Sequence, residues 1–448
     1  MKQLSKSIVP LGNLVGVIVF GQLSDIFGRK PIFVINLVLA IVTAILTSFA
    51  PNYALFIIGQ FCLGAFPHSM FVTGTVIVME MIGLEYRTMC GSLIHVAFSV
   101  FYMLFGVIAL LSGGNWRLIQ LIAGLIWILY LPSIFVILES PMWLMRKRKY
   151  DKAEKVLRRF AKAENTELPK NLFEKDDETK SEVEDQDSEL RQYTVVDLFR
   201  TPNLRTRTIL MCFNWFSCSF VYYGISLNTD QLGSNPYTTF ILAGFVEVPG
   251  RLLAWWLMYA IGRRWSLAGF CIVGGLSLML SVPPEIPELS VAIAMVAKLC
   301  LAAVFAIVYV YGAEIYPTVV RNAGMGVSSM SARVGSIISP YVMLLQVYWG
   351  PMPFVIMGTT SILAGMLALF LPETRNKTLT ETLEEGENFG RKSYKENEKG
   401  QIEVKMDTLK ESEETGLDVE GASESNEKHA NGGLSCDSEM GVANKGFE

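Results

Sequence analysis

Residues 21–31 read Gly-Gln-Leu-Ser-Asp-Ile-Phe-Gly-Arg-Lys-Pro, a short charged turn that joins the apolar runs 5–23 and 31–50. Each run has roughly the 20 residues that a helix needs to cross the hydrocarbon core of a bilayer. A backbone in lipid must satisfy its own hydrogen bonds, and the runs are too long for barrel strands. The stretch therefore predicts two membrane-spanning helices joined on one side of the membrane.

Apolar runs of this length recur along most of the chain. Of the 448 residues, 51% are hydrophobic and 18% are charged, a combination that soluble domains rarely show. No small-residue cleavage site follows the first run, so we interpret it as a span rather than as a signal peptide. We predict an all-α membrane protein with eleven spans, at 5–23, 31–50, 53–79, 88–112, 117–138, 208–228, 237–261, 265–283, 289–313, 322–346 and 352–371.

Lysine and arginine are confined to every second connection between these spans. The basic connections hold Arg29 and Lys30, Arg87, the stretch 146–159, Arg263 and Arg264, and Arg321. The opposite connections hold none between the spans, and Arg117 lies only at the edge of one. Because cytoplasmic loops carry the excess of basic residues, we expect the basic connections and the C-terminus in the cytoplasm and Met1 outside.

Two long polar segments divide the chain into four parts. We predict an N-terminal bundle of five spans at 1–138, a cytoplasmic central loop at 139–207, a C-terminal bundle of six spans at 208–376 and a disordered cytoplasmic tail at 377–448. In the central loop, Tyr150, Ala153, Leu157 and Phe160 fall on one helical face. This helix lies on the inner membrane surface or is a solvated linker. The acidic run 174–189 that follows is expected to be disordered.

The chain contains an internal repeat. Three pairs of features share one offset of 234 residues (262 − 28, 314 − 80 and 373 − 139): Gly28-Arg29-Lys30 with Gly262-Arg263-Arg264, Glu80 and Arg87 with Glu314 and Arg321, and Glu139 with Glu373. The span 208–228 would then have its counterpart before Met1. We therefore predict two six-helix repeats in the same orientation, the first without its first helix.

Several motifs resemble the major facilitator superfamily and its organic cation, anion and carnitine transporter branch. They are the turn 21–31, Glu139-Ser140-Pro141-Met142-Trp143-Leu144, Val221-Tyr222-Tyr223-Gly224, the stretch 313–322 and Leu371-Pro372-Glu373-Thr374. The resemblance implies the major facilitator fold and a secondary carrier, facilitative or ion-coupled, that works by alternating access. Its expected partners are a small organic ion as substrate, the lipid bilayer and a coupling ion, sodium or proton. The plasma membrane is its expected location.

Three departures from that branch qualify the resemblance. Met142 stands where the branch usually has Arg after Ser-Pro. The first helix and the large cysteine-rich extracellular loop after it have no counterpart. These departures favour an alternative, a truncated form that does not transport and that acts as a regulatory or non-functional membrane protein.

Charged residues at the cytoplasmic helix ends are candidates for a gate. The set comprises Asp25, Arg29, Glu80, Arg87, Glu139, Glu314, Arg321 and Glu373. Oppositely charged partners among them could hold the two halves together in the outward-open state and release them in the inward-open state. The alternative is that they form static ion pairs in the loops and act as topology signals.

Three charged residues inside predicted spans are candidates for substrate binding. Arg333 lies near mid-membrane, where inserting a charge costs at least about 2.5–3.5 kcal/mol. Glu247 and Lys298 lie in two other spans. They contact the substrate or pair with one another to hold helices together. By resemblance, anion and carnitine carriers have Arg where Arg333 stands, whereas cation carriers have Asp, and Glu247 matches an acidic position of cation-handling members. Together these two charges would suit a zwitterion.

Aromatic residues complete the candidate site. Tyr222 and Tyr223 are the leading choices, since aromatic faces attract quaternary ammonium groups. His68 and His95 could relay protons. We favour the alternative, in which they pack against neighbouring helices or hydrogen-bond to them. The sequence has no enzyme or P-loop motif and no paired cysteines or Cys/His cluster, so we predict neither an enzyme nor a metal or cofactor site, and no nucleic-acid partner.

Overall fold

The computed structural model describes residues 2–82, 84–163, 195–227, 235–281, 287–375, 377, 380 and 382–389. The predicted acidic run and the greater part of the predicted tail lie outside these residues. The chain divides into a unit of residues Met1–Glu387 and a second of Asn388–Glu448. Apart from the last residue of the helix α16 (Leu383–Asn388), every element described below belongs to the first unit.

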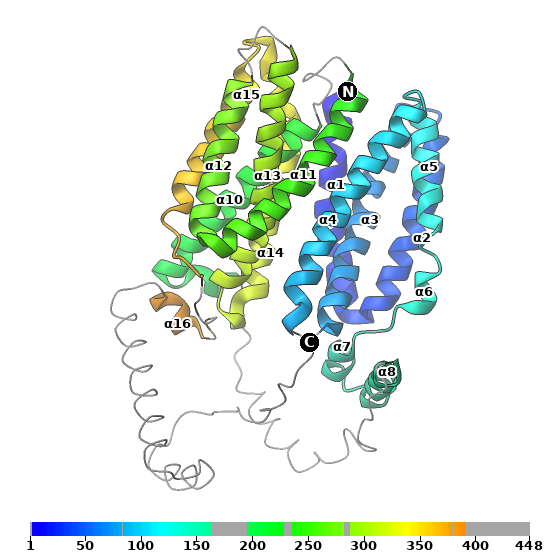
Figure 1. The fold of residues 1–448 in the computed structure, drawn as a ribbon. Coiled ribbons are helices and arrows are strands. Elements are labelled where there is room, and N and C mark those ends of the chain that lie inside the picture. The colour runs from blue at the N-terminus through cyan, green and yellow to red at the C-terminus, as the bar shows by residue number, and fades with distance from the viewer. Residues whose placement is uncertain are drawn as a thin grey trace, which may run out of the picture. The chain divides into compact units, whose positions relative to one another are not determined.

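The N-terminal bundle is built from five long helices (Figure 1). Short turns join them, so that neighbours in sequence run antiparallel. Their bounds are α1 Lys2–Phe27, α2 Arg29–Ser48, α3 Tyr53–Met81, α4 Leu84–Leu111 and α5 Trp116–Ile128, which continues into the short α6 Ser133–Val136.

The C-terminal bundle contains the remaining six long helices. They are α10 Pro202–Ser226, α11 Pro236–Ala260, α12 Arg263–Leu280, α13 Pro287–Ile315, α14 Arg321–Val342 and α15 Met352–Ala368. Short elements flank them: the 3₁₀ turns η1 Val195–Phe199, η3 Thr318–Val320 and η4 Met343–Val347, and the helix α16 Leu383–Asn388.

All eleven predicted spans coincide with one of these helices, which confirms the all-α membrane fold. Within the described residues, eight helices are long and apolar enough to cross a membrane. The other three are α12, α14 and α15. Helix α15 is apolar but has 17 residues, whereas α12 begins with Arg263 and Arg264 and α14 carries Arg321 and Arg333. Length and polarity therefore make these three spans weaker signals than the rest.

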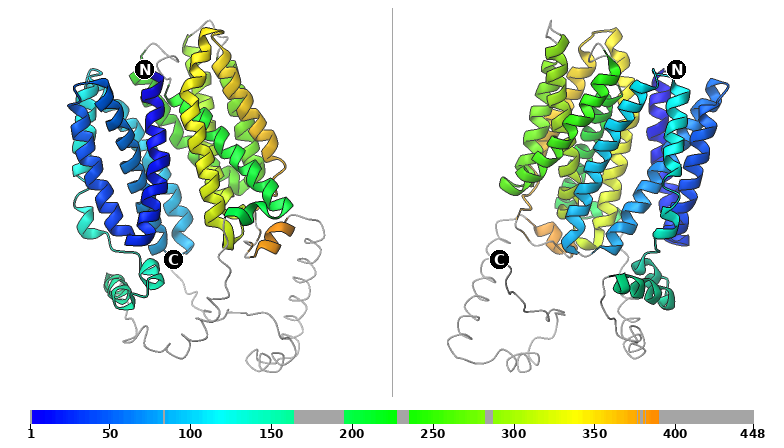
Figure 2. Two further views of the ribbon diagram at one scale, coloured as in Figure 1. Left: turned by 180° about the vertical axis from the view of Figure 1, so that it is seen from behind. Right: turned by 45° about the vertical axis from the view of Figure 1, so that its right-hand side comes forward.

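The two bundles pack their helices in the same order. In the first, α3 packs against α1 and α2, and α2 packs against α5. In the second, α13 packs against α11 and α12, and α12 packs against α15. Helix α10 packs mainly against α14 and α15. The bundles meet along two seams, α4 against α11 and α1 against α14 (Figure 2).

The outer faces of the helices are apolar. Trp255 and Phe370 expose 61% and 77% of their surface, whereas the buried core of the C-terminal bundle holds Trp215, Tyr311 and many small residues. An exposed apolar surface of this kind suits contact with lipid tails.

The basic helix predicted in the central loop is confirmed as α8, Tyr150–Ala163. It follows the short helix α7, Pro141–Arg146, and Ala153 is fully buried in a small cluster with Trp143 and Leu144. Phe160, at the other end of the predicted face, is 37% exposed. The helix is thus anchored at one end, and its contact with the membrane surface stays a prediction.

Candidate functional site

At the end of the N-terminal bundle where α1 turns into α2, the end predicted to be cytoplasmic, Glu139 caps the start of α2. Its carboxylate accepts hydrogen bonds from the backbone N–H of Arg29 (2.9 Å) and of Lys30. The first N–H groups of a helix lack intrahelical partners and favour a negative charge. Gly28 has a φ of 118°, and a Cβ there would lie 2.6 Å from the Glu139 carboxylate. Only glycine allows this close approach.

The guanidinium of Arg29 completes this cluster. It lies 2.7 Å from the carboxylate of Asp25 and 3.4 Å from that of Glu80. Arg29 is 5% exposed, so its ion pairs are only partly screened by water.

The C-terminal bundle repeats the arrangement except at Asp25, whose counterpart at the 234-residue offset is Tyr259. Glu373 accepts hydrogen bonds from the backbone N–H of Arg263 (2.9 Å) and Arg264 (3.1 Å) at the start of α12. The Arg263 guanidinium pairs with Glu314 at 2.9 Å. Gly262 has a φ of 100°, and a Cβ there would also lie 2.6 Å from a carboxylate oxygen of Glu373. The 234-residue offset thus relates two geometrically equivalent clusters.

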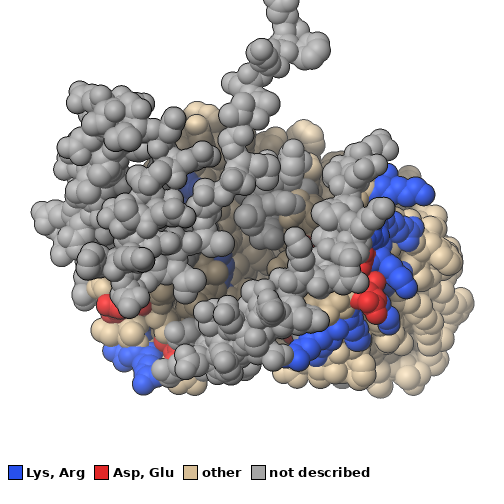
Figure 3. Space-filling view, turned by 90° about the horizontal axis from the view of Figure 1, so that it is seen from below, with Lys and Arg blue, Asp and Glu red and all other residues tan. Residues whose placement is uncertain are grey.

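These clusters bear on the predicted gate. Among the gate residues whose side chains are described, every ion pair joins two residues of the same bundle. Arg321 donates to the Tyr316 carbonyl and the Thr318 hydroxyl, and the Arg87 side chain lies outside the described residues. Figure 3 shows this face, on which basic side chains, with acidic ones among them, are visible at two sides. A latch between bundles therefore stays a prediction for another conformation.

Inside the membrane region, Glu247 on α11 is the centre of a second network. One carboxylate oxygen accepts the Tyr222 hydroxyl (2.6 Å) and pairs with Lys298 (3.1 Å). The other accepts the Ser99 hydroxyl (3.1 Å) and pairs with Arg251 (3.0 Å). Glu247 is fully buried, so these four partners replace the water that its charge would need.

Arg251 and Ser99 are the partners of Glu247 that the sequence reasoning missed, and Arg251 is the one that carries a charge. It lies four residues after Glu247 on the same helix, which is the spacing of a helical ion pair, so that pattern could have found it. Its guanidinium also donates to the His95 carbonyl and lies 5.6 Å from the Phe98 ring centroid, both on α4. Arg251 and Ser99 therefore tie the two bundles together.

Lys298 on α13 is the second cation of the network and is fully buried. Its ammonium lies 3.4 Å from the ring centroid of Tyr222 and 5.4 Å from that of Tyr102. It also donates to the Ser226 hydroxyl. The predicted candidates Glu247, Lys298 and Tyr222 thus form one connected group.

Arg333 on α14 belongs to a different group. Its guanidinium makes no hydrogen bond or ion pair with any part of the chain that the structure describes. It lies within electrostatic range of His68, Tyr223 and Tyr309, which come from α3, α10 and α13. Tyr223 lies within electrostatic range of both Arg333 and Glu247, and its ring centroid is 5.5 Å from that of Tyr222, so it links Arg333 to the Glu247 network.

The hydrogen bonds between the two bundles lie in two regions. Among the described residues, four hydrogen bonds join the bundles: Lys6 to the Leu227 carbonyl, Ser7 to the Ile337 carbonyl, Ser99 to Glu247, and Arg251 to the His95 carbonyl. The first two lie at the outer helix ends and the other two near mid-membrane. Tyr102 also stacks on Phe240 with ring centroids 4.0 Å apart. Among the described residues, the bundles are thus joined near the middle of the helices and at the helix ends opposite the Glu139 and Glu373 clusters.

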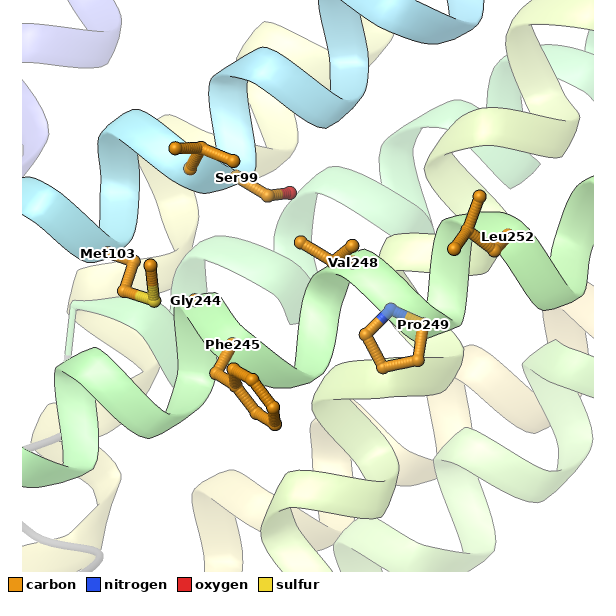
Figure 4. A pocket seen from close by; sticks show the side chains of 8 residues that line it. Ser99, Met103, Gly244, Phe245, Val248, Pro249 and Leu252 are labelled. Atoms are coloured by element: carbon orange, nitrogen blue, oxygen red, sulfur yellow. The ribbon is translucent and has the colours of Figure 1, made fainter.

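An apolar cavity of about 420 Å³ lies along the α4–α11 seam (Figure 4). Its lining includes Met103, Phe245, Val248 and Leu252, with Ser99 as the only polar side chain. Phe245 and Leu252 are largely exposed, so the cavity faces the lipid side of the seam. Its chemistry does not suit an ion, and we place the candidate substrate site at Arg333 and Tyr223 instead.

Two equivalent bundles with charges buried along their common seam define a polytopic α-helical transporter. Within the described residues, no three His, Cys, Asp or Glu side chains come together as metal ligands would. The comparisons with known proteins give the family.

The family model described as "Sugar (and other) transporter" matches residues 2–385. The "Organic cation transporter protein" of Drosophila melanogaster is 41% identical over 393 residues, which cover 87% of this chain and 72% of that protein. Human "Organic cation/carnitine transporter 2" is 35% identical over 386 residues, covering 85% and 68% of the two chains.

Among solved structures, the inward open conformation of the xylose transporter XylE from E. coli is similar in fold, with a TM-score of 0.63. It is 17% identical and covers 84% of this chain and 88% of that chain. The chain therefore belongs to the sugar (and other) transporter family of the major facilitator superfamily. Its curated relatives are organic cation and carnitine transporters and members of solute carrier family 22.

Proposed function

We propose that this chain carries small organic ions that bear a carboxylate, organic anions or zwitterions, across the membrane by alternating access. The single observation that carries the proposal is the guanidinium of Arg333 inside the membrane region, which has no partner among the residues that the structure describes. A charge held there without a partner is costly and marks a functional site by default. A substrate carboxylate would supply the missing partner through two parallel hydrogen bonds.

The net charge of the seam supports this substrate class. Around the two groups lie three cations, Arg251, Lys298 and Arg333, and one carboxylate, Glu247. Surroundings of low dielectric constant concentrate such a field and attract anions. Tyr223 and Tyr309, within electrostatic range of Arg333, would add aromatic faces for the rest of the substrate.

Alternating access would act through the bonds between the bundles. Opening to the outside would break the Lys6 and Ser7 bonds at the outer helix ends. The cytoplasmic clusters of Asp25, Arg29 and Glu80 and of Arg263 and Glu314 would then approach one another and exchange partners. We propose the plasma membrane as the location and sodium or proton as the coupling ion.

Uptake by the full chain in proteoliposomes tests the proposal. We would compare labelled carnitine, a dicarboxylate and tetraethylammonium for wild type, Arg333→Asp and the exposed control Arg205→Gln on α10. We expect Arg333→Asp to lose carboxylate uptake by at least about tenfold, the value of one lost charge-assisted hydrogen bond. The control should transport like wild type. Unchanged carnitine and dicarboxylate uptake by Arg333→Asp would overturn the proposal.

Organic cations are the second candidate class, because the relatives' printed names include organic cation transporters. This class would be favoured if wild type took up tetraethylammonium faster than the carboxylates and if Arg333→Asp retained that tetraethylammonium uptake.

A further inference from the structure

The surroundings of Lys298 have the chemistry of a binding site for ammonium ions. The Glu247 carboxylate lies 3.1 Å from its Nζ, the Tyr222 ring centroid 3.4 Å and the Tyr102 ring centroid 5.4 Å. The Ser226 hydroxyl accepts a hydrogen bond from the same nitrogen. A carboxylate combined with two aromatic faces is how proteins bind free ammonium groups. We call these four residues the ammonium cage.

The ammonium cage is assembled from both bundles. Tyr222 and Ser226 come from α10 and Glu247 from α11, whereas Tyr102 comes from α4 of the N-terminal bundle. The Lys298 side chain enters from α13. The cage therefore lies on the seam between the bundles, near the middle of the membrane, where an alternating-access carrier exposes its substrate site.

We infer that Lys298 permanently occupies a site for organic cations. Its ammonium group fills the cage that would otherwise hold a small free alkylammonium ion. Lys298 thereby restricts this carrier to substrates with a carboxylate. The inference rests on the proposed function and assigns Lys298 the role of a specificity-determining residue.

A free cation cannot readily displace this lysine. A tethered group has a high effective concentration at its own site. Displacement would also leave a second cation buried close to Arg251, without a partner. Wild type should therefore bind small ammonium ions weakly.

Removing the lysine should leave the cage intact. Glu247 would keep its ion pair with Arg251 and its hydrogen bonds from Ser99 and Tyr222, so its charge would stay compensated. Lys298→Ala deletes the three methylene carbons Cγ to Cε and the nitrogen Nζ. The ion n-propylammonium has that set of heavy atoms. Lys298→Met removes the charge but fills the same space, and is the matched control.

The test measures thermal unfolding of the purified full chain with increasing n-propylammonium chloride. A ligand that binds only the folded state raises the unfolding temperature with the logarithm of its concentration. We expect n-propylammonium chloride to raise the unfolding temperature of Lys298→Ala by about 2 °C or more. For wild type and Lys298→Met, it should raise the unfolding temperature no more than sodium chloride does. Adding Glu247→Gln to Lys298→Ala should abolish the rise.

Equal rises in Lys298→Ala and Lys298→Met, or no rise in Lys298→Ala, would overturn the inference. Should Lys298→Ala fail to accumulate, n-propylammonium added during expression should restore folded protein, and failure of this rescue would also count against it. The Arg333→Asp uptake assay reads out the proposed function separately. If Arg333→Asp loses carboxylate uptake but Lys298→Ala does not bind n-propylammonium, the proposed function stands and only the inference about the ammonium cage fails.

Discussion

Glu247 and Arg333 are both charges inside the membrane region, yet their surroundings differ completely. Glu247 has four partners, Tyr222, Lys298, Ser99 and Arg251, which satisfy both of its oxygens. Arg333 has no ion pair or hydrogen bond from its side chain among the described residues. A charge whose partners are all built into the chain holds helices together. A charge without partners is held ready for a ligand, so the two residues should respond differently to substitution.

The largest expected effect is on stability and follows from Glu247→Gln. The substitution leaves Lys298 and Arg251 buried with no counter-charge, and breaking a buried pair in this way costs about 3–5 kcal/mol. Thermal unfolding of the detergent-solubilised full chain measures the change. Wild-type stability in this variant would show that the network is not structural, and the contrast with Arg333 would disappear.

Arg333→Gln should have the opposite profile. Because the substitution removes a charge that has no partner among the described residues, the variant should be at least as stable as wild type. Carboxylate uptake should fall by at least about tenfold through the lost charge-assisted hydrogen bonds. Unfolding and uptake are measured on the same preparation, with Arg205→Gln as the control. Destabilisation together with retained uptake would reverse the roles assigned to the two residues.

A smaller effect tests whether the two cytoplasmic clusters are equivalent. Glu139→Ala and Glu373→Ala each remove the acceptor for the first N–H groups of α2 or α12, a loss typical of helix caps at about 0.5–2 kcal/mol. We expect similar losses of stability in both variants. A loss in one variant only would mean that the repeat preserves the geometry of the clusters but not their energetic role.

The smallest effect concerns Glu387, a carboxylate with built-in partners outside the membrane. Burial would raise its pKa, but the backbone N–H groups of Asn203 and Leu204 at the start of α10 outweigh this and hold the pKa below its usual value. Its stabilisation is therefore present above the ordinary pKa and is lost as the pH falls through the lowered folded pKa. Unfolding temperatures of Glu387→Gln should decline less than those of wild type across that acidic range. Parallel declines would contradict the assignment.

Helix positions were predictable because each span has a long apolar run, and the 234-residue offset correctly paired Glu139 with Glu373 and Glu80 with Glu314. The partners of these residues were harder to predict. Nothing in the sequence distinguishes ion pairs within a bundle from those between bundles, since that depends on the conformation. Ser99 is 148 positions from Glu247, and their contact arises only where α4 crosses α11. The ion pair of Arg251 with Glu247, by contrast, could have been predicted from their four-residue spacing alone.

The position of the Ser99–Glu247 bond has a mechanical consequence. From Glu247 to the cytoplasmic end of α11 at Ala260 there are 13 residues, a lever of about 20 Å at the rise of an α-helix. If the seam acts as the fulcrum, a tilt of about 10° moves that end by about 3.5 Å while the fulcrum itself hardly shifts. Small adjustments beside the ammonium cage would therefore produce much larger displacements at the membrane surface.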